Sequence, residues 1–221
     1  MFPVFIVGGG ASLKNFNFSL LQEKDTICIN RSVLDVPKPT YFVTMDYTFV
    51  KEIENKTNNK LSRESFSNLD CQKYFIVSTN NKYIRFINNY WRDTRFNYCY
   101  DLKEFNHVIP SKKNIAIGHT FEDFVHGSNS GFCAVQLALL LGYKEIYLLG
   151  IDLNINNGLS HYHEDYHQDI KTFVKRMELY YSSFLVGIHN IKLVYPDVKI
   201  YTCSHGKITD LVEYKDIKDI E

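Results

Sequence analysis

Three histidines stand close together in the stretch LSHYHEDYHQD, whose last residue is Asp169. Imidazole is the usual general base near neutral pH, so His161, His163 or His167 could take a proton from a reacting hydroxyl. Asp152 lies shortly before the cluster and is a further catalytic candidate. The spacing of His163 and His167 also suits a metal, but spacing alone indicates one weakly, and we predict no metal site. The alternative is a solvated loop whose histidines have no role.

A glycine turn follows the first apolar run of the chain, in VFIVGGGASL, which starts at Val4. Glycines such as Gly8, Gly9 and Gly10 let the backbone approach a ligand, and N–H groups at a helix start face an anion. With Ser12 beside them, they predict a phosphate cradle. The turn lacks the lysine of a P-loop and the spacing of a dinucleotide fingerprint. A tight turn without a ligand is the alternative.

Polar side chains also follow the next two apolar runs. Asn30 and Arg31 come after Thr26–Ile29, and Asp46 comes after Tyr41–Thr44. Residues at the carboxyl ends of parallel strands line the ligand crevice of such sheets. Asparagine can bond a ribose hydroxyl or a base, and arginine can pair with phosphate. Simple polar turns are the alternative reading.

The stretch GSNSGFCAVQLALLLGYKEIYLLGID predicts a helix and then a strand. Its apolar residues recur at helical spacing over Gly131–Leu141, Gly142 ends the helix, and Glu145–Leu149 is the strand. We expect Ser128 or Ser130 to cap the helix. Most of this stretch is core, and its candidates for the site are Ser130, Gly131, Gly150 and Asp152.

The elements that must position these residues alternate between short strands and helices. The strands are continuous apolar runs, as expected where a sheet is covered on both faces. We predict an α/β fold, a doubly wound, mostly parallel Rossmann-like sheet with helices on both faces. Besides the runs above, the expected strands are Val4–Val7, Tyr74–Ser78 and Ile200–Cys203, and the expected helices are Tyr47–Asn55, Tyr83–Tyr90 and Gln168–Phe184.

Residues 1–221 are expected to form one domain. The polar stretch Lys56–Leu69 reads as an exposed connection, and residues 91–120 read as an irregular insertion. Residues 153–168 are a candidate lid over the site.

Composition excludes several classes of protein. The chain has 25 Lys and Arg against 25 Asp and Glu, so bulk charge does not favour nucleic acid. No apolar run is long enough to span a membrane, and the start lacks the basic flank of a signal peptide. Five scattered cysteines without a CxxC pair indicate reduced thiols. We expect a cytoplasmic protein.

The glycine opening VGGGASLKNFNFSLL and the stretch NSGFCAVQLALLLGYKEIYLLGID resemble the bacterial sialyltransferases of glycosyltransferase family 42. They equally resemble the wider domain-of-unknown-function 115 group, which includes archaeal pyrophosphokinases. The tail IYTCSHGKITDLVEY resembles the closing segment of that family. The resemblance covers both ends and the middle, but not residues 50–120.

This resemblance implies a GT-A-like fold and a transferase that uses a CMP-activated sugar without an obligatory metal or cofactor. It implies binding of the nucleotide by Gly8, Gly9, Gly10, Ser12, Asn30 and Asp46, with Asp46 replacing the asparagine of the family. It implies a catalytic histidine at His163 or His167. The implied partners are a nucleotide sugar and a glycan or glycolipid acceptor. Peripheral association with a membrane and assembly into a homo-oligomer are both compatible with this sequence.

Two other functions remain open at this stage. A pyrophosphokinase would share the fold and need Mg²⁺, for which Asp46 and Asp152 are available. A nucleotide-binding module without catalysis is the other, because a fold does not by itself imply activity.

Overall fold

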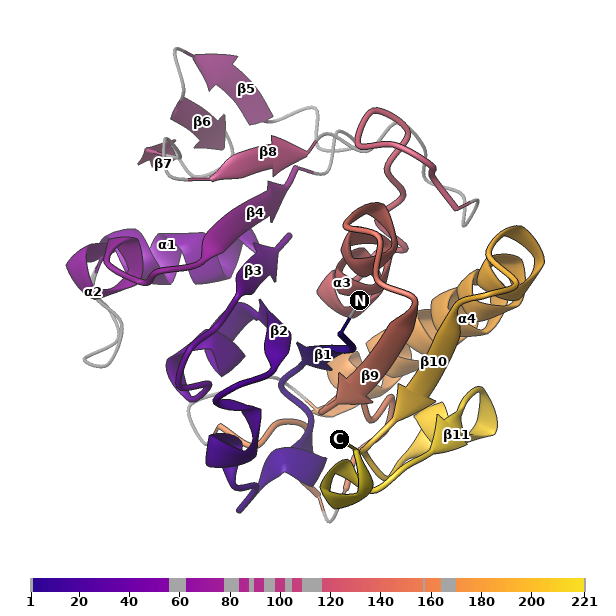
Figure 1. Cartoon of the computed structure of the whole chain (residues 1–221). Helices are drawn as coiled ribbons and strands as arrows, with labels where there is room; N and C mark the ends of the chain where they lie inside the picture. Colours follow the sequence, from indigo (N-terminus) through magenta and orange to yellow (C-terminus); the bar gives the residue numbers. More distant parts are fainter. Residues whose placement is uncertain are drawn as a thin grey trace.

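A parallel β-sheet forms the centre of the protein (Figure 1). The computed structural model describes residues 2–55, 63–77, 84–87, 90–93, 98–101, 105–108, 117–156, 158–163 and 170–220. All seven neighbouring strand pairs in this sheet run parallel, which confirms the predicted α/β fold. In sheet order the strands are β11 (Glu213–Tyr214), β10 (Lys199–Thr202), β9 (Glu145–Leu149), β1 (Val4–Val7), β2 (Asp25–Ile29), β3 (Tyr41–Thr44), β4 (Gln72–Ile76) and β8 (Asn106–Val108).

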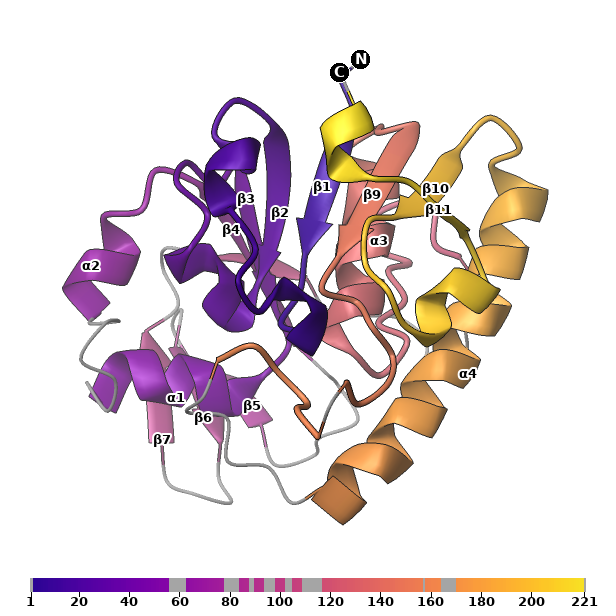
Figure 2. The ribbon, with the colours of Figure 1, turned by 90° about the horizontal axis from the view of Figure 1, so that it is seen from below.

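Helices cover both faces of this sheet (Figure 2). One face carries α3 (Ser130–Leu140) and α4 (Ile170–Val194), and the other carries α1 (Tyr47–Asn55), α2 (Arg63–Ser67) and short 3₁₀ turns. Strand residues alternate between the two cores, so Val4 and Ile6 join the first and Phe5 joins the second. Full burial on both faces explains why the strands read as continuous apolar runs.

Helix α3 is the inner helix of its layer. A side-chain cap begins it and a glycine ends it. The side chain of Asn129 accepts a hydrogen bond from the N–H of Phe132 at 2.7 Å, so Asn129 is the cap and not Ser128 or Ser130. At the other end, Gly142 adopts a φ of 86°. The N–H of Gly142 and that of Tyr143 bond back to the helix, which is a Schellman ending.

The order of the strands creates a switch point beside β1. The chain runs outward from β1 through β2, β3, β4 and β8, and then returns to place β9 on the other side of β1. The loops that follow β1 and β9 therefore leave the sheet in opposite directions. Parallel sheets bind ligands in the crevice that forms at such a point.

Four expectations from the sequence differ from the structure. The helix expected over Tyr83–Tyr90 is wrong, because Ile84–Ile87 forms β5, whose β-branched and aromatic residues suit a strand. The insertion expected to be irregular contains β6 (Tyr90–Asp93), β7 (Tyr98–Asp101) and β8, and β5, β6 and β7 form an antiparallel sheet. The polar stretch 56–69 contains α2, and α4 runs ten residues beyond its expected end at Phe184.

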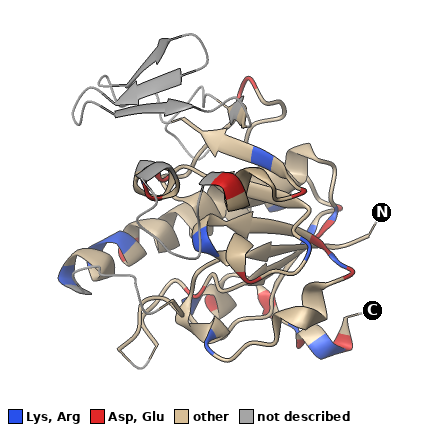
Figure 3. Ribbon diagram, turned by 90° about the vertical axis from the view of Figure 1, so that its left-hand side faces the viewer, with Lys and Arg blue, Asp and Glu red and all other residues tan. Residues whose placement is uncertain are grey.

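Figure 3 shows basic and acidic residues interspersed along the described ribbon, in agreement with the balanced composition. Among the described helices, none is both long and apolar enough to cross a membrane.

Candidate functional site

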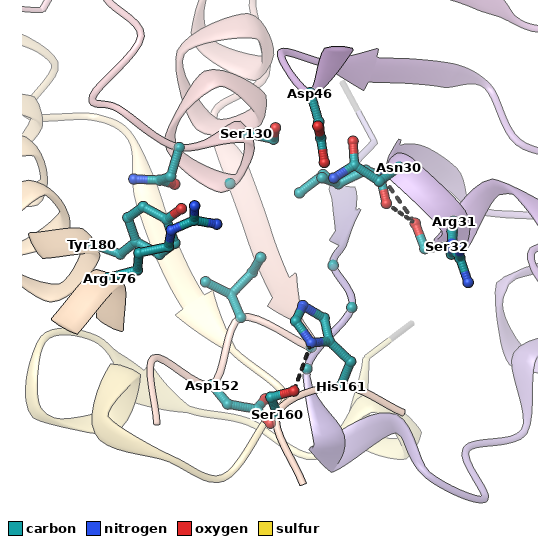
Figure 4. Close-up of a pocket in the computed structure, with 18 of the residues that line it drawn as sticks. Asn30, Arg31, Ser32, Asp46, Ser130, Asp152, Ser160, His161, Arg176 and Tyr180 are labelled. Carbon is teal, nitrogen blue, oxygen red and sulfur yellow. Dashed lines mark hydrogen bonds between the residues drawn. The ribbon is translucent and has the colours of Figure 1, made fainter. Parts of the chain in front are cut away.

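A cavity of about 540 Å³ opens at the carboxyl ends of β1, β2, β3 and β9 (Figure 4). The start of α3 and one side of α4 complete its wall. It lies at the switch point, where the topology predicts a ligand. Of the residues predicted for the site, it is lined by Gly8, Gly9, Gly10, Asn30, Arg31, Asp46, Ser130, Gly131, Gly150, Asp152 and His163.

The glycine turn is first a packing device. The N–H of Gly8 bonds the carbonyl of Leu149 at 2.7 Å, and the N–H of Gly10 bonds that of Gly150 at 2.8 Å. A Cβ on Gly10 would lie 2.6 Å from the Asp152 carboxyl group. Two of the three glycines therefore bring β1 and β9 together, and their N–H groups are already used within the chain.

The carboxylate of Asp152 organises the end of this turn. It accepts the N–H of Ser12 at 2.8 Å and the Ser12 hydroxyl at 2.5 Å, while Asn156 donates a third bond at 3.2 Å. Burial raises the pKa of Asp152, and these hydrogen bonds lower it. Ser12 does not line the cavity, because its polar groups face Asp152 and Ser204.

Asn30 is held in a left-handed conformation at the end of β2, with a φ of 52°. Its carbonyl oxygen Oδ1 accepts the hydroxyl of Thr44 at 2.7 Å, which fixes the amide. Among the described residues, its Nδ2 has no hydrogen-bond partner, so two N–H groups remain as donors at the cavity wall.

Asp46 and Ser130 form the wall above Asn30 (Figure 4). Asp46 accepts the N–H of Thr48 at 2.9 Å, so this carboxylate caps α1. Asparagine and aspartate cap helices about equally well, so the same backbone accommodates either at this position. Ser130 and Gly131 are the first residues of α3, whose positive end faces the cavity.

The strap formed by residues 158–163 crosses the glycine turn and closes one side of the cavity. His161 forms a β-bridge with Gly10, and the N–H of Tyr162 bonds the carbonyl of Gly9 at 3.1 Å. The His161 ring meets the Ser160 hydroxyl at 3.0 Å and packs edge-on against Phe173. Burial lowers the pKa of His161 to about 4, with contributions from the charges of His163 and Arg31.

His163, the second histidine of the strap, is paired with a carboxylate. Its Nε2 lies 3.1 Å from Asp35 Oδ2, an electrostatic contact that does not meet hydrogen-bond geometry. The hydroxyl of Tyr162 donates to the same oxygen at 2.8 Å. His163 lines the cavity and Asp35 does not, so the ring contacts both the cavity and a carboxylate outside its wall.

The letters HEDYH at residues 163–167 also match the H-E-x-x-H order of zinc proteases, which places both histidines on one face of a helix. His163 lies in a bend and not in a helix, and α4 begins only at Ile170. His167 lies outside the described residues.

The opposite wall is formed by α4, none of whose residues was predicted for the site from the sequence. Arg176 and Tyr180, one helical turn apart, both line the cavity opposite Asn30 and Asp46 (Figure 4). Burial raises the pKa of Tyr180, and the charge of Arg176 opposes that rise. Arg31, on the other side, bonds Glu52 at 2.8 Å. The sequence predicted a helix over Gln168–Phe184, but it could not show that one face of this helix borders a cavity.

Strained backbone gathers at this cavity. Of the four described non-glycine residues with positive φ, three line it: Asn30, Ser128 and Leu153. Such conformations cost free energy and cluster at functional sites.

No family model matches this chain, and no curated protein matches it. Solved structures do share its fold. Monomeric CstII has a TM-score of 0.52 at 16% identity, over 96% of this chain and 85% of that one. The Campylobacter jejuni sialyltransferase CstII in complex with the substrate analogue CMP-3FNeuAc has a TM-score of 0.53 at 14% identity, over 100% and 89%.

A Maf glycosyltransferase from Magnetospirillum magneticum AMB-1 has a TM-score of 0.56 at 16% identity. The match covers 99% of this chain but only 34% of that protein. At these identities the likeness establishes a common fold.

Proposed function

We propose that this chain is a nucleotide-sugar glycosyltransferase whose donor is a CMP-activated sugar. The observation that carries the proposal is the cavity at the switch point, whose lining includes the glycine turn, Asn30 and a histidine paired with a carboxylate. It is supported by the fold, because similar structures were solved with CMP and with a CMP-sugar analogue. Another was solved with a trisaccharide acceptor and CMP.

The nucleotide would be held by the groups that the chain leaves unused. Asn30 offers its amide N–H groups, and the first turn of α3 offers a positive end to a phosphate. Gly9 lets the turn pass close to the His161 ring, since a Cβ at this position would lie 3.1 Å from that ring. The glycine turn would thus mainly provide space for the nucleotide sugar, and only to a lesser extent N–H groups that bind it.

The reaction would be a direct displacement at the sugar. An acceptor hydroxyl attacks the anomeric carbon, the bond from that carbon to the phosphate oxygen breaks, and the nucleoside monophosphate leaves. His163 takes the hydroxyl proton, and the resulting imidazolium is stabilised by Asp35 at 3.1 Å. Because Nε2 lies against Asp35, Nδ1 is the nitrogen that would accept the proton.

Asp152 is a positioning residue in this proposal. Its oxygens accept three hydrogen bonds from Ser12 and Asn156, so it fixes the turn that carries the strap. The same bonds argue against the pyrophosphokinase alternative, which would need Asp152 and Asp46 as ligands of Mg²⁺.

Binding of CMP tests the proposal directly. A ligand that binds only the folded state raises the melting temperature, so CMP should do so in EDTA, while ATP should not. The variant Asn30→Asp removes the two amide donors and should abolish the CMP shift. Asn17→Asp is the matched control, because Asn17 does not line the cavity and its side-chain oxygen caps a 3₁₀ turn.

Turnover then separates a transferase from a binding module. Release of CMP from a CMP-sugar, accelerated by a glycan acceptor, is the expected result. A shift only with ATP and Mg²⁺ would favour the pyrophosphokinase, and CMP binding without CMP release would leave a module without catalysis.

A further inference from the structure

The outer face of α4 carries an apolar stripe that is exposed to solvent. Leu179, Val186 and Leu193 recur every seven residues and are 53%, 45% and 69% exposed. At about 100° per residue, all three lie within roughly 20° of one line along the helix. Figure 2 shows this helix at the edge of the molecule, and no described element covers its outer side.

A seven-residue apolar repeat is the pattern of helices that pair with other helices. The stripe spans roughly 21 Å, at about 1.5 Å of rise per residue. Leu185, beside Val186, is 49% exposed and widens it. The opposite face of α4 is fully used, because Phe184, Ile188 and Ile191 are buried in the core beside α3.

We infer that α4 pairs with α4 of a second copy of this chain, antiparallel about a two-fold axis at Val186. In that arrangement Val186 meets itself, Leu185 meets itself, and Leu179 meets Leu193 of the other copy. The stripe is thus self-complementary, as an isologous interface requires.

The charges beside the stripe favour this occupant and this direction. Glu178 and Lys192 stand seven residues on either side of Leu185, so each would face the other on the side of the interface where Leu185 meets itself. Neither of these two side chains forms an ion pair with a residue that the structure describes. A parallel pairing would instead place like charges together, which costs free energy.

Cross-linking tests the geometry. In the variant Val186→Cys the two thiols would meet at the axis, so mild oxidation should give a covalent dimer. Val174→Cys is the matched control, because Val174 is similarly exposed on α4 but lies twelve residues from the axis. Equal cross-linking of both variants, or of neither, would overturn the arrangement.

Oligomeric state tests the interface itself. Light scattering after gel filtration should give a mass of two copies of 25.9 kDa. Val186→Glu should raise the dissociation constant about tenfold or more, by burying a charge at the axis. A wild-type chain that stays monomeric at all concentrations up to about 0.1 mM would overturn the proposal, because its self-association would be weaker than an interface of this kind requires.

The inference is independent of the proposed function. Val186 does not line the cavity, so Val186→Glu should keep the CMP shift of the wild-type chain. A failure of CMP to bind would leave the cross-linking result unchanged.

Discussion

The carboxylate of Asp152 holds both the backbone N–H and the hydroxyl of Ser12, at 2.8 and 2.5 Å, across 140 residues of sequence. The pair ties the turn after β1 to the loop after β9. Because the cavity opens between these two segments, the pair sets the shape of its floor.

Replacing Asp152 by Asn should therefore destabilise the fold. The amide group can accept at one atom only, so one bond of Ser12 or Asn156 would be lost and a buried donor left unpaired. We expect a loss of about 1–3 kcal/mol in the free energy of unfolding. Urea denaturation measures it, and Ser12→Ala should cost less because it removes only the hydroxyl. An unchanged Asp152→Asn midpoint would show that the pair carries no stability.

Gly9 and Gly10 should respond differently to replacement by alanine. In Gly10→Ala, the new Cβ would lie 2.6 Å from the Asp152 carboxyl group, so we expect a loss of about 1–3 kcal/mol. In Gly9→Ala the new Cβ meets only a ring carbon of His161 at 3.1 Å. Gly9→Ala should therefore melt near the wild type. Similar melting temperatures for both variants would contradict this account.

Burial of His161 should make stability depend on pH. Its pKa is lowered from 6.5 to about 4 in the folded chain, so the unfolded chain binds more protons between these values. The free energy of unfolding should fall as pH is lowered from 6.5 to 4, by up to about 3 kcal/mol from this group. In His161→Gln the slope should be flatter. His189→Gln, on the exposed side of α4, is the control and should keep the wild-type slope.

Under the proposed function, His163 should matter for the chemical step more than for binding. His163→Gln should lower kcat by about 10²- to 10⁴-fold and leave the KM for the donor nearly unchanged. Asp35→Asn should also lower kcat, since it removes the charge that stabilises the protonated ring. Tyr162→Phe keeps the ring and removes only the hydroxyl that bonds Asp35, so its kcat should stay closer to the wild type. If His161→Gln alone abolished turnover, His161 would be the base.

Local pattern was sufficient for the core of the fold. The strands β1 and β3 and the helix α1 begin and end at the predicted residues, because a buried strand and an amphipathic helix leave clear periods in sequence. The sequence pattern gave the wrong prediction over Tyr83–Tyr90. The aromatic residues there fit the period of a helix as well as that of a strand, and pairing with β6 makes the segment a strand. The polar residues after β1, β2, β3 and β9 could be predicted to converge, because the carboxyl ends of parallel strands share one edge.

Tertiary structure alone decided what each of these residues does at that edge. Nothing local indicates that the N–H groups of Gly8 and Gly10 bond β9, or that Ser12 turns away from the cavity toward Asp152. The cavity wall formed by Arg176 and Tyr180 was equally hidden, because it depends on how α4 crosses the sheet. Periodicity is a property of neighbours along the chain, whereas these contacts join segments that only strand order and helix packing bring together.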